Sequence, residues 1–263
     1  MKRASQSDDL PAVVPVRAGG LTGFVARALA ADGAAEPERL RARQGAAVLK
    51  ESRSTLVFVA PVGGQLVVVK RYRKERLAAR LLMALRRSRA RRAWTCAYAL
   101  RAAAIRVPRA LGALEARRLR VLRRSYALAE FVAAAETLKR VLRSEPPGSA
   151  RRLGIARRLG RLLGRIHAAG FRARDLKAAN FLVDGAGRVW LVDLDGVRPA
   201  RARRIRARRG RDLARLLRDV AGSGRLDPGE RRAFVRGYRR GQRRARSRRV
   251  PPAGPASGAT PGA

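Results

Sequence analysis

One stretch of this sequence, RIHAAGFRARDLKAANFLVDGAGRVWLVDLDGVR at residues 165–198, gathers the residue types that could carry out catalysis. Asp175 is followed five residues later by Asn180 and thirteen residues after that by Asp193, with Asp195 close behind. Acidic residues are scarce in this chain, which has 62 Lys and Arg against 19 Asp and Glu. Their concentration here predicts a site with chemistry of its own.

The residues between Asn180 and Asp193 predict a β-hairpin. Two short apolar runs, 181–183 and 189–192, flank the turn residues 184–187, and such a turn closes two antiparallel strands. The hairpin would bring Asn180 and Asp193 together as a pair of hard oxygen ligands suited to Mg²⁺. Asp175, on the loop just before, could accept a proton from a hydroxyl nucleophile. The alternative is an ordinary polar hairpin whose aspartates cap turns.

The net charge of +43 is carried almost entirely by arginine. Such a field attracts polyanions, including nucleic acid, anionic lipid and phosphorylated sugars. A general preference of the chain for Arg and Ala explains the charge equally well, because the arginines recur everywhere. Lysines are few, and Lys50, Lys70 and Lys177 fall in the segments VLKESRSTLVFV, VVVKRY and RDLKAAN.

The remaining composition excludes several classes of protein. The single cysteine, Cys96, forms no intramolecular disulfide, and one cysteine with one histidine cannot build a structural zinc site. The first residues, MKRASQSDDLPAVV, lack the apolar core of a secretory signal. No run approaches the ~20 apolar residues of a membrane span. We therefore expect a cytoplasmic protein.

The N-terminal half alternates like a small antiparallel sheet. Runs 47–50, 55–59 and 65–70 are β-rich, and Gly63-Gly64 is a good hairpin turn. Residues 1–44 predict a loose leader, with a short helix over 21–31. Helical spacing predicts a helix over 73–104, and strands follow near Leu114 and at 118–122 and 126–132.

The C-terminal half reads as mainly helical. Helices are predicted over 137–143 and 150–169, from Asp212 onward, and over 231–240, whereas 199–210 is basic and poorly patterned. Asp212 could cap its helix or brace the loop of Asp175 from behind. Residues 247–263, rich in Pro, Gly, Ser and Ala, are expected to be disordered.

RDLKAAN followed by LVDLD resembles the catalytic loop and metal-binding segment of the protein-kinase-like superfamily. Together with VLKESRSTLVFV, VVVKRY, RRAWTCAYALRAAAIRVPRALG and DLARLLRDV, it resembles the bacterial lipopolysaccharide core kinases. That family phosphorylates Kdo or heptose sugars of the lipid A inner core with ATP and Mg²⁺. The resemblance implies an α+β fold with two lobes, a small antiparallel-sheet N-lobe and a mainly helical C-lobe.

The resemblance also implies roles for residues. Asp175 would be the base that activates a sugar hydroxyl, Asn180 and Asp193 the Mg²⁺ ligands, and Lys70 the clamp on the ATP phosphates. An acid at Asp195, where protein kinases have the glycine of Asp-Phe-Gly, favours an acceptor that is not a protein. The 126–132 strand would meet adenine through its backbone, and Glu130 either anchors it or lies on the surface.

Three features depart from ordinary protein kinases. The turn 51–54 has no glycine, although Ser52 and Ser54 could still hold phosphate. No acid occurs between Glu75 and Glu115, so the helix glutamate expected to pair with Lys70 is missing from its usual place. Ala173 stands where protein kinases have the histidine of His-Arg-Asp. His167 is expected to be structural, bracing the catalytic loop.

The predicted organisation is an extension at 1–44, an N-lobe at 45–127, a C-lobe at 128–246 and a tail at 247–263. The expected partners are ATP, a lipopolysaccharide core or lipid A precursor as acceptor, and an anionic membrane in peripheral contact. A kinase-fold enzyme with another small-molecule or protein acceptor stays open. So does a pseudokinase-like basic scaffold that binds anionic lipid or nucleic acid without turnover.

Overall fold

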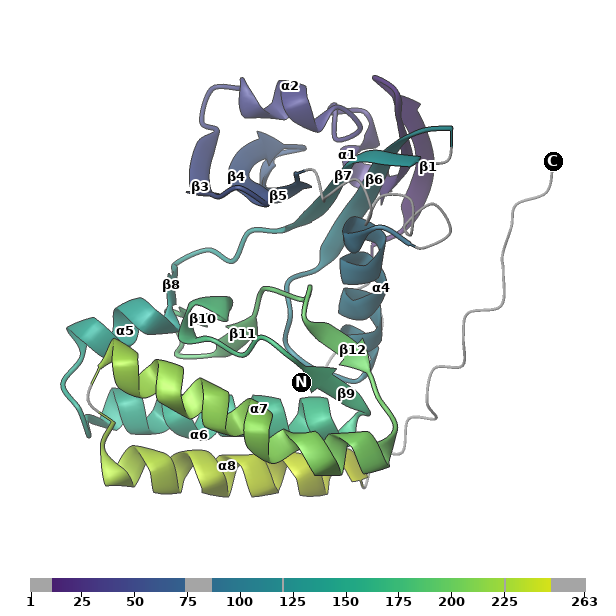
Figure 1. The fold of residues 1–263 in the computed structure, drawn as a ribbon. Helices are drawn as coiled ribbons and strands as arrows, with labels where there is room; N and C mark the ends of the chain where they lie inside the picture. The colour runs from purple at the N-terminus through teal and green to yellow at the C-terminus, as the bar shows by residue number, and fades with distance from the viewer. Residues whose placement is uncertain (1–10, 74–86, 120, 225, 247–263) are drawn as a thin grey trace, which may run out of the picture. The chain divides into compact units, whose positions relative to one another are not determined.

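The computed structural model describes residues 11–73, 87–119, 121–224 and 226–246, with side chains in the last segment described as far as Arg243 (Figure 1). The chain divides into two compact units. Unit 1 comprises Met1–Tyr98 and Pro108–Val132, and unit 2 comprises Ala99–Val107 and Ala133–Ala263. The predicted disordered tail and residues 1–10 of the predicted leader lie outside the described residues, as do Glu75 and residues 74–86 of the helix expected at 73–104.

Unit 1 is built on one antiparallel sheet of seven strands in the order β1-β2-β6-β7-β5-β4-β3. The sequence places alternate apolar side chains of these strands on a buried face, where Phe58, Val67 and Val69 are almost fully enclosed. The strands are β1 (Val13–Ala18), β2 (Leu21–Ala26), β3 (Ala47–Glu51), β4 (Thr55–Val62), β5 (Gln65–Tyr72), β6 (Ala110–Arg118) and β7 (Val121–Glu130).

The predicted hairpin at Gly63-Gly64 joins β4 to β5. Both glycines have positive φ, +57° and +70°, and Val62 pairs directly with Gln65. A two-residue turn with positive φ at both positions matches the twist of the flanking strands, and glycine adopts it without steric cost. The strands predicted from 47 to 70 are thereby confirmed, with Lys70 near the end of β5.

The predictions for residues 12–44 are wrong in two respects. Instead of a loose leader, β1 and β2 form a hairpin, and β2 pairs with β6 through Thr22↔Glu115 to Val25↔Gly112. Instead of a helix from Leu21, a strand runs to Ala26, and only α1 (Arg27–Ala30) is helical, followed by α2 (Pro37–Arg41). The spacing of the apolar residues in this stretch is compatible with both a helix and a strand. Pairing with the edge of β6 favours the strand.

Of the helix predicted over 73–104, the described residues confirm only α4 (Arg89–Ala102), whereas residues 73, 87, 88, 103 and 104 are not helical. Ser88 caps the start of α4, because the Ser88 hydroxyl accepts a hydrogen bond from the Arg91 backbone nitrogen at 3.1 Å. Tyr98 is the last α4 residue in unit 1, and the helix continues into unit 2.

Unit 2 is mainly helical, with two small sheets in the orders β11-β10-β8 and β12-β9. The predicted fold class, α+β with an antiparallel-sheet part and a helical part, is confirmed. The helices are α5 (Leu138–Ser144), α6 (Ala150–Ala168), the 3-10 helix η1 (Ala178–Asn180), α7 (Ala202–Ser223) and α8 (Pro228–Arg246). The strands are β8 (Ala135–Thr137), β9 (Phe171–Ala173), β10 (Phe181–Asp184), β11 (Val189–Leu191) and β12 (Val197–Pro199).

Helices α6 and α8 pack with their backbones in close contact. A Cβ atom added at Gly160 of α6 would lie 2.1 Å from the Phe234 carbonyl oxygen, and one at Gly237 of α8 would lie 2.1 Å from the Arg157 oxygen. Gly164 and Gly241, one turn further along each helix, meet the opposite backbone in the same way. The glycines therefore set the distance between the two helices.

Helix α7 begins at Ala202, ten residues before the predicted start at Asp212. The segment expected to be poorly patterned is its first half. Its buried stripe is thin, with Ile205, Leu216 and Val220 among the buried residues, and exposed arginines fill many of the other positions. No helix of the described residues is long and apolar enough to cross a membrane.

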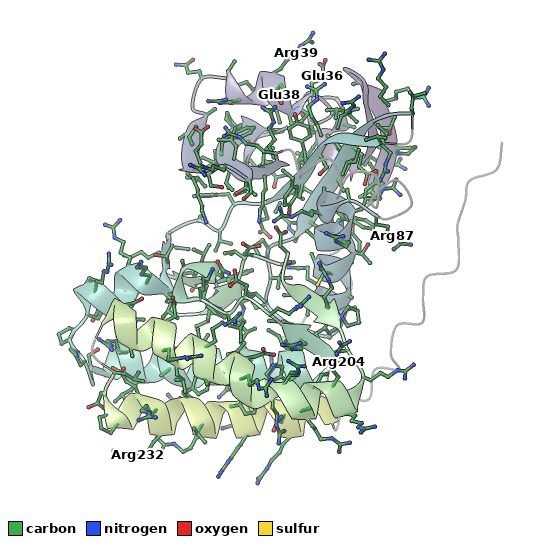
Figure 2. All side chains as sticks on the ribbon, viewed as in Figure 1. Glu36, Glu38, Arg39, Arg87, Arg204 and Arg232 are labelled. Atoms are coloured by element: carbon green, nitrogen blue, oxygen red, sulfur yellow. The ribbon has the colours of Figure 1, made fainter. Side chains whose placement is uncertain are left out.

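Exposed arginines occur on both units. Arg39 of α2 and Arg87 lie in unit 1, and Arg204 of α7 and Arg232 of α8 lie in unit 2 (Figure 2). The positive charge is therefore not concentrated on one face of either unit. The distribution of charge does not locate a functional site, and the contacts between side chains are needed to identify one.

Candidate active site

The β10–β11 hairpin forms as the sequence predicts, and its turn is organised by Asp184. The buried Asp184 carboxylate accepts hydrogen bonds from the Arg188 backbone at 2.9 Å, Arg188 Nε at 2.7 Å and Trp190 Nε1 at 2.9 Å. Burial by itself would raise the pKa of Asp184, but the hydrogen bonds from Trp190 and Arg188 outweigh it and lower that pKa. Asp184 is thus the aspartate that caps the turn between β10 and β11.

The two ends of the hairpin meet. Phe181 pairs with Leu191, and the Val192 nitrogen donates to the Asn180 carbonyl oxygen at 3.0 Å. Asn180 and Asp193 are therefore adjacent at the open end of the hairpin. The Asp193 carboxylate accepts a hydrogen bond from the Asp195 backbone nitrogen at 3.2 Å, which fixes the turn that follows.

Asp175 is held beside Asn180. The Asn180 side-chain nitrogen donates to the Asp175 carbonyl oxygen at 2.9 Å, across the single turn η1. The Asp175 carboxylate is half exposed, and its Oδ1 lies 3.0 Å from Lys177 Nζ. The sequence indicated Lys177 through the scarcity of lysine, and the structure gives it a partner, the carboxylate of Asp175.

The segment after Asp193 returns to Asp175. Strand β12 pairs with β9 through Val197↔Ala173, and the Arg174 nitrogen donates to the Gly196 carbonyl oxygen at 3.0 Å. A Cβ atom at Gly196 would lie 3.1 Å from the Asp175 backbone nitrogen, so the chains approach tightly here. Within unit 2, these contacts bring Asp175, Asn180 and Asp193 into one neighbourhood.

Helix α7 supports this loop from behind through its two buried or half-buried acids. Asp212 binds the Arg172 guanidinium with two hydrogen bonds, at 2.7 and 2.9 Å. Asp219 accepts a hydrogen bond from the Ala178 backbone nitrogen at 2.6 Å, inside the loop itself. Asp212 lies in the middle of α7, so of the two roles considered for it the structure shows bracing and not capping.

Asp219 was missed by the sequence reasoning. Its spacing of seven residues from Asp212 puts both acids on one face of a helix, and that spacing could have indicated it. Arg215, between them, donates from Nη1 to the Arg174 carbonyl oxygen at 2.9 Å. One face of α7 therefore contacts residues 172, 174 and 178.

The residues of this neighbourhood fit a magnesium ion. The Asn180 amide is oriented by its nitrogen, which leaves its oxygen as the atom able to bind a cation. Among the described residues no group of three or more His, Cys, Asp or Glu side chains could hold a metal ion. Mg²⁺ does not need such a cage, because proteins bind it with one or two side chains and complete its shell with water and phosphate.

Lys70 lies on β5 in unit 1, where the register places it between Val57 of β4 and Ala127 of β7. Its Nζ lies 5.2 Å from the centre of the Tyr72 ring, and the residue is half-buried. Because β5 is paired on both sides, β4 and β7 together fix the backbone position of Lys70.

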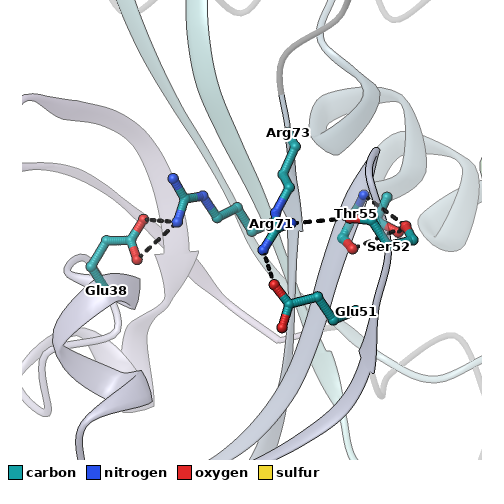
Figure 3. A network of polar contacts seen from close by, with 6 residues as sticks. All are labelled: Glu38, Glu51, Ser52, Thr55, Arg71 and Arg73. Atoms are coloured by element: carbon teal, nitrogen blue, oxygen red, sulfur yellow. Dashed lines mark hydrogen bonds and ion pairs between the residues drawn. The ribbon is translucent and has the colours of Figure 1, made fainter.

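The turn 51–54 is closed by its own side chains (Figure 3). Ser52 Oγ accepts a hydrogen bond from the Thr55 nitrogen at 3.1 Å, and the Ser52 nitrogen donates to the Thr55 carbonyl oxygen at 2.8 Å. Arg73 donates to the Ser52 carbonyl oxygen at 3.2 Å and pairs with Glu51. Ser52 is therefore engaged in the turn, whereas the Ser54 side chain is exposed.

Glu115, the first acid after the gap in the sequence, is committed to the start of α4. Its buried carboxylate accepts hydrogen bonds from the Ser88 nitrogen at 3.3 Å and Arg117 Nε at 2.9 Å. Burial would raise the pKa of Glu115, but the hydrogen bonds from Ser88 and Arg117 prevail and lower it. Glu38 is likewise engaged, because it pairs with Arg71 at 3.1 Å (Figure 3). It also accepts a hydrogen bond from the Tyr126 hydroxyl.

Two further expectations concern single residues. Glu130 anchors the end of β7, since it accepts hydrogen bonds from the Arg109 nitrogen at 3.1 Å and Arg109 Nε at 3.3 Å. His167 is buried, and its Nδ1 lies 2.6 Å from the Tyr238 hydroxyl of α8. The contact of His167 is thus with α8, and the bracing of the loop comes from α7.

Comparisons with known proteins agree on one family. The model of the lipopolysaccharide kinase (Kdo/WaaP) family matches residues 38–238. A 3-deoxy-D-manno-octulosonic acid kinase of Xylella fastidiosa (strain M12) is 45% identical over 64 residues, which are 24% of this chain and 24% of that protein. A kinase of the same name from Stenotrophomonas maltophilia (strain K279a) is 48% identical over 62 residues, 23% of this chain and 24% of the relative.

The match therefore spans about a quarter of the length of these curated relatives. Among solved structures, WaaP in complex with acyl carrier protein superimposes with a TM-score of 0.56 and 24% identity, covering 77% of this chain and 81% of that one. This likeness supports the fold.

Proposed function

Because the chain belongs to the lipopolysaccharide kinase (Kdo/WaaP) family, we propose that it is a kinase that transfers phosphate from ATP to a sugar of the lipopolysaccharide inner core. The observation that carries the proposal is the neighbourhood of Asp175, Asn180 and Asp193 within unit 2. These are the residue types that phosphoryl transfer needs, a base for the hydroxyl and oxygen ligands for a metal ion.

Each residue has a role in this proposal. Asp175 accepts the proton of the attacking sugar hydroxyl, and Asn180 and Asp193 hold Mg²⁺ through their side-chain oxygens. When bound, Mg²⁺ supplies positive charge against the charge that develops on the transferred phosphoryl group. Lys70 contacts the phosphates of ATP, and the exposed Ser54 hydroxyl contributes a hydrogen-bond donor to them.

Lys177 adds to the chemistry around Asp175. With its Nζ 3.0 Å from the carboxylate, it keeps a positive charge next to the group that takes the proton. A lysine at this position can also neutralise a phosphate oxygen of the nucleotide. We place it among the residues that position the reacting groups.

Kdo is the acceptor that we favour over heptose. The relatives that match in sequence are named 3-deoxy-D-manno-octulosonic acid kinases, and their identity of 45 to 48% over 62 to 64 residues supports this choice. Because the acceptor is an anionic lipid, we further propose that the protein acts in the cytoplasm at the inner face of the membrane, in peripheral contact with it.

The test is Mg²⁺-dependent transfer of labelled γ-phosphate from ATP to a lipopolysaccharide core acceptor. Asp175→Asn and Asp193→Asn should each lower the rate at least about a hundredfold, the effect typical of losing a general base or a metal ligand. Arg232→Gln, an exposed charge change on α8, is the matched control and should react like the wild type.

The outcomes separate the alternatives. If this acceptor stays unlabelled while ATP is hydrolysed in a manner that depends on Asp193, the kinase stands and the acceptor is another molecule. If neither reaction occurs and the variants bind ATP like the wild type, the protein is a basic scaffold and the proposal fails. Nucleic-acid binding with a steep salt dependence would then support the scaffold.

A further inference from the structure

The β6–β7 hairpin extends past the strands on either side of it. Strand β2 pairs with β6 only as far as Glu115, and β5 pairs with β7 only as far as Ser125. Beyond these residues β6 and β7 pair with each other alone, through Ala116↔Arg124 to Arg118↔Val121. The described residues 116–119 and 121–124, here called the ribbon, therefore form a two-stranded projection of the seven-stranded sheet in unit 1.

The tip of the ribbon presents an apolar side chain to solvent. Leu119 is 90% exposed, whereas the next most exposed large apolar residue of the described chain, Leu49, is 53% exposed. Leu119 also has φ +48°, a left-handed conformation that disfavours residues with a side chain and usually selects Gly or Asn at such a turn. A leucine at this position neither buries apolar surface in the fold nor suits the turn. A contact of Leu119 with another molecule would account for its presence.

The ribbon is also basic. Arg118, Arg123 and Arg124 are exposed, and within the described residues none of them is in an ion pair with a carboxylate. Arg117 is the exception, because Glu115 holds it at 2.9 Å. The surface of an anionic membrane has a layer of charged headgroups above the acyl chains. The aliphatic side chain at the tip suits the acyl chains, and the guanidinium groups behind it suit the headgroup phosphates.

Nucleic acid fits this ribbon less well. Proteins that grip single strands stack bases on aromatic side chains, and the ribbon sequence ARRL and VLRR has none on either side of residue 120. An aliphatic tip instead gains free energy by entering the boundary between headgroups and acyl chains.

We propose that the ribbon docks on the anionic surface of a lipid bilayer. Leu119 enters the acyl boundary, and Arg118, Arg123 and Arg124 bind phosphates of the headgroups. This inference rests on the membrane contact in the proposed function and gives it a surface, but it does not require phosphoryl transfer. Its test therefore contains neither ATP nor an acceptor sugar, so that its failure is distinct from failure of the kinase.

The experiment is co-sedimentation of the full chain with vesicles of phosphatidylcholine alone or mixed with phosphatidylglycerol. Leu119→Asn removes the apolar group and places at this φ a residue that tolerates it, so we expect the turn and the fold to be retained. We expect Leu119→Asn to weaken partitioning into the mixed vesicles about tenfold, as loss of one inserted leucine implies. The double variant Arg123→Gln, Arg124→Gln should weaken partitioning into these vesicles by a similar factor, because each charge contributes about fivefold or less.

Val235→Asn on α8 is the matched control, since Val235 is an exposed apolar residue, 44% exposed, in unit 2. It should partition like the wild type, and wild type should prefer the mixed vesicles. The proposal is overturned if Leu119→Asn partitions like the wild type, or if Val235→Asn is weakened as much. It is also overturned if the wild type ignores both kinds of vesicle, whether or not it binds duplex DNA.

Discussion

At the scale of single residues, the scarce acids of this chain account for much of its internal order. Asp184, Asp212 and Asp219 each receive hydrogen bonds from arginine, tryptophan or backbone groups at 2.6 to 2.9 Å. Glu230 lies with Arg152 in a pair whose side chains are each only 2% exposed. Hydrogen bonds to a charged acceptor are stronger than neutral ones, and removing the acid leaves its donors unsatisfied. Other acids, among them Glu36, Glu51 and Glu136, form ion pairs at the surface, and such pairs contribute little.

His167 gives the clearest dependence on pH. Burial is the main cause that lowers its pKa, from 6.5 to about 4, so the folded state keeps the ring neutral. Below pH 6.5 the unfolded chain binds the proton and the folded chain does not. The free energy of unfolding should therefore fall between pH 6.5 and about 4, by up to about 3 kcal/mol at ~1.4 kcal/mol per pKa unit.

The measurement is urea unfolding at several pH values for the wild type and for His167→Gln, which does not titrate and retains a partner for the Tyr238 hydroxyl. The difference in unfolding free energy between the two proteins should shrink or change sign as the pH falls through this window. A constant difference from pH 7 to pH 4 would contradict the burial of a neutral ring.

At the scale of elements, α7 acts on the loop of Asp175 through a single face. Asp219→Ala should remove the acceptor for the Ala178 nitrogen and let the loop relax. Misplacement of a catalytic group lowers the rate more than it lowers binding. We expect kcat to fall about tenfold or more while the KM for ATP changes little.

Asp219→Asn keeps an oxygen that can accept this hydrogen bond, so it should recover most of the lost kcat. The readout is the split between kcat and KM in both variants, beside their melting temperatures. Equal losses in the two variants, or a loss explained by unfolding, would assign Asp219 to general stability and not to the positioning of the loop.

The contact of α6 with α8 makes a second prediction at this scale. Gly160→Ala puts a methyl group 2.1 Å from the Phe234 carbonyl oxygen, so the helices have to separate. We expect a loss of unfolding free energy of about 2 kcal/mol or more, as for overpacking. Gly210→Ala in α7 is the control, because nothing lies within 4 Å of its added Cβ, and there alanine should stabilise by about 0.5–1 kcal/mol. Urea denaturation of both variants decides, and equal effects would contradict the close packing.

The elements also show where sequence reasoning succeeds. Strands β3 to β5 and the β10–β11 hairpin were predicted because alternation and local turn residues specify them. Strands β1 and β2 were missed because only pairing with β6, about ninety residues away, settles their period. The first half of α7 was missed because arginines cover all but a thin stripe around Ile205. The neighbourhood of Asp175, Asn180 and Asp193 was predicted because it is local in sequence, whereas Asp219 binds a residue 41 positions away.

At the scale of the whole molecule, the excess of 62 basic over 19 acidic residues means that repulsion is the dominant surface interaction. Exposed ion pairs such as Arg39 with Glu36 are worth at most about 1 kcal/mol each. They are too few to offset a net charge of +43, which disfavours the compact state. Binding of any polyanion relieves the same repulsion. The affinity measured for an anionic ligand at low salt therefore reflects the net charge of the protein more than a specific binding site.

Repulsion and ion pairing predict opposite responses to salt. Added salt shortens the Debye length, to about 8 Å at 0.15 M. This screening weakens the repulsion between exposed arginines more than it weakens the attraction within buried pairs such as Arg152 with Glu230. We therefore expect sodium chloride to raise the unfolding free energy on the order of 1 kcal/mol, which is about 2–4 °C in Tm for a chain of this size. Thermal unfolding between 0.02 and 0.3 M salt measures it. A Tm that falls with salt would mean that the surface ion pairs outweigh the net charge, and the arginines would then serve the fold and not an anionic partner.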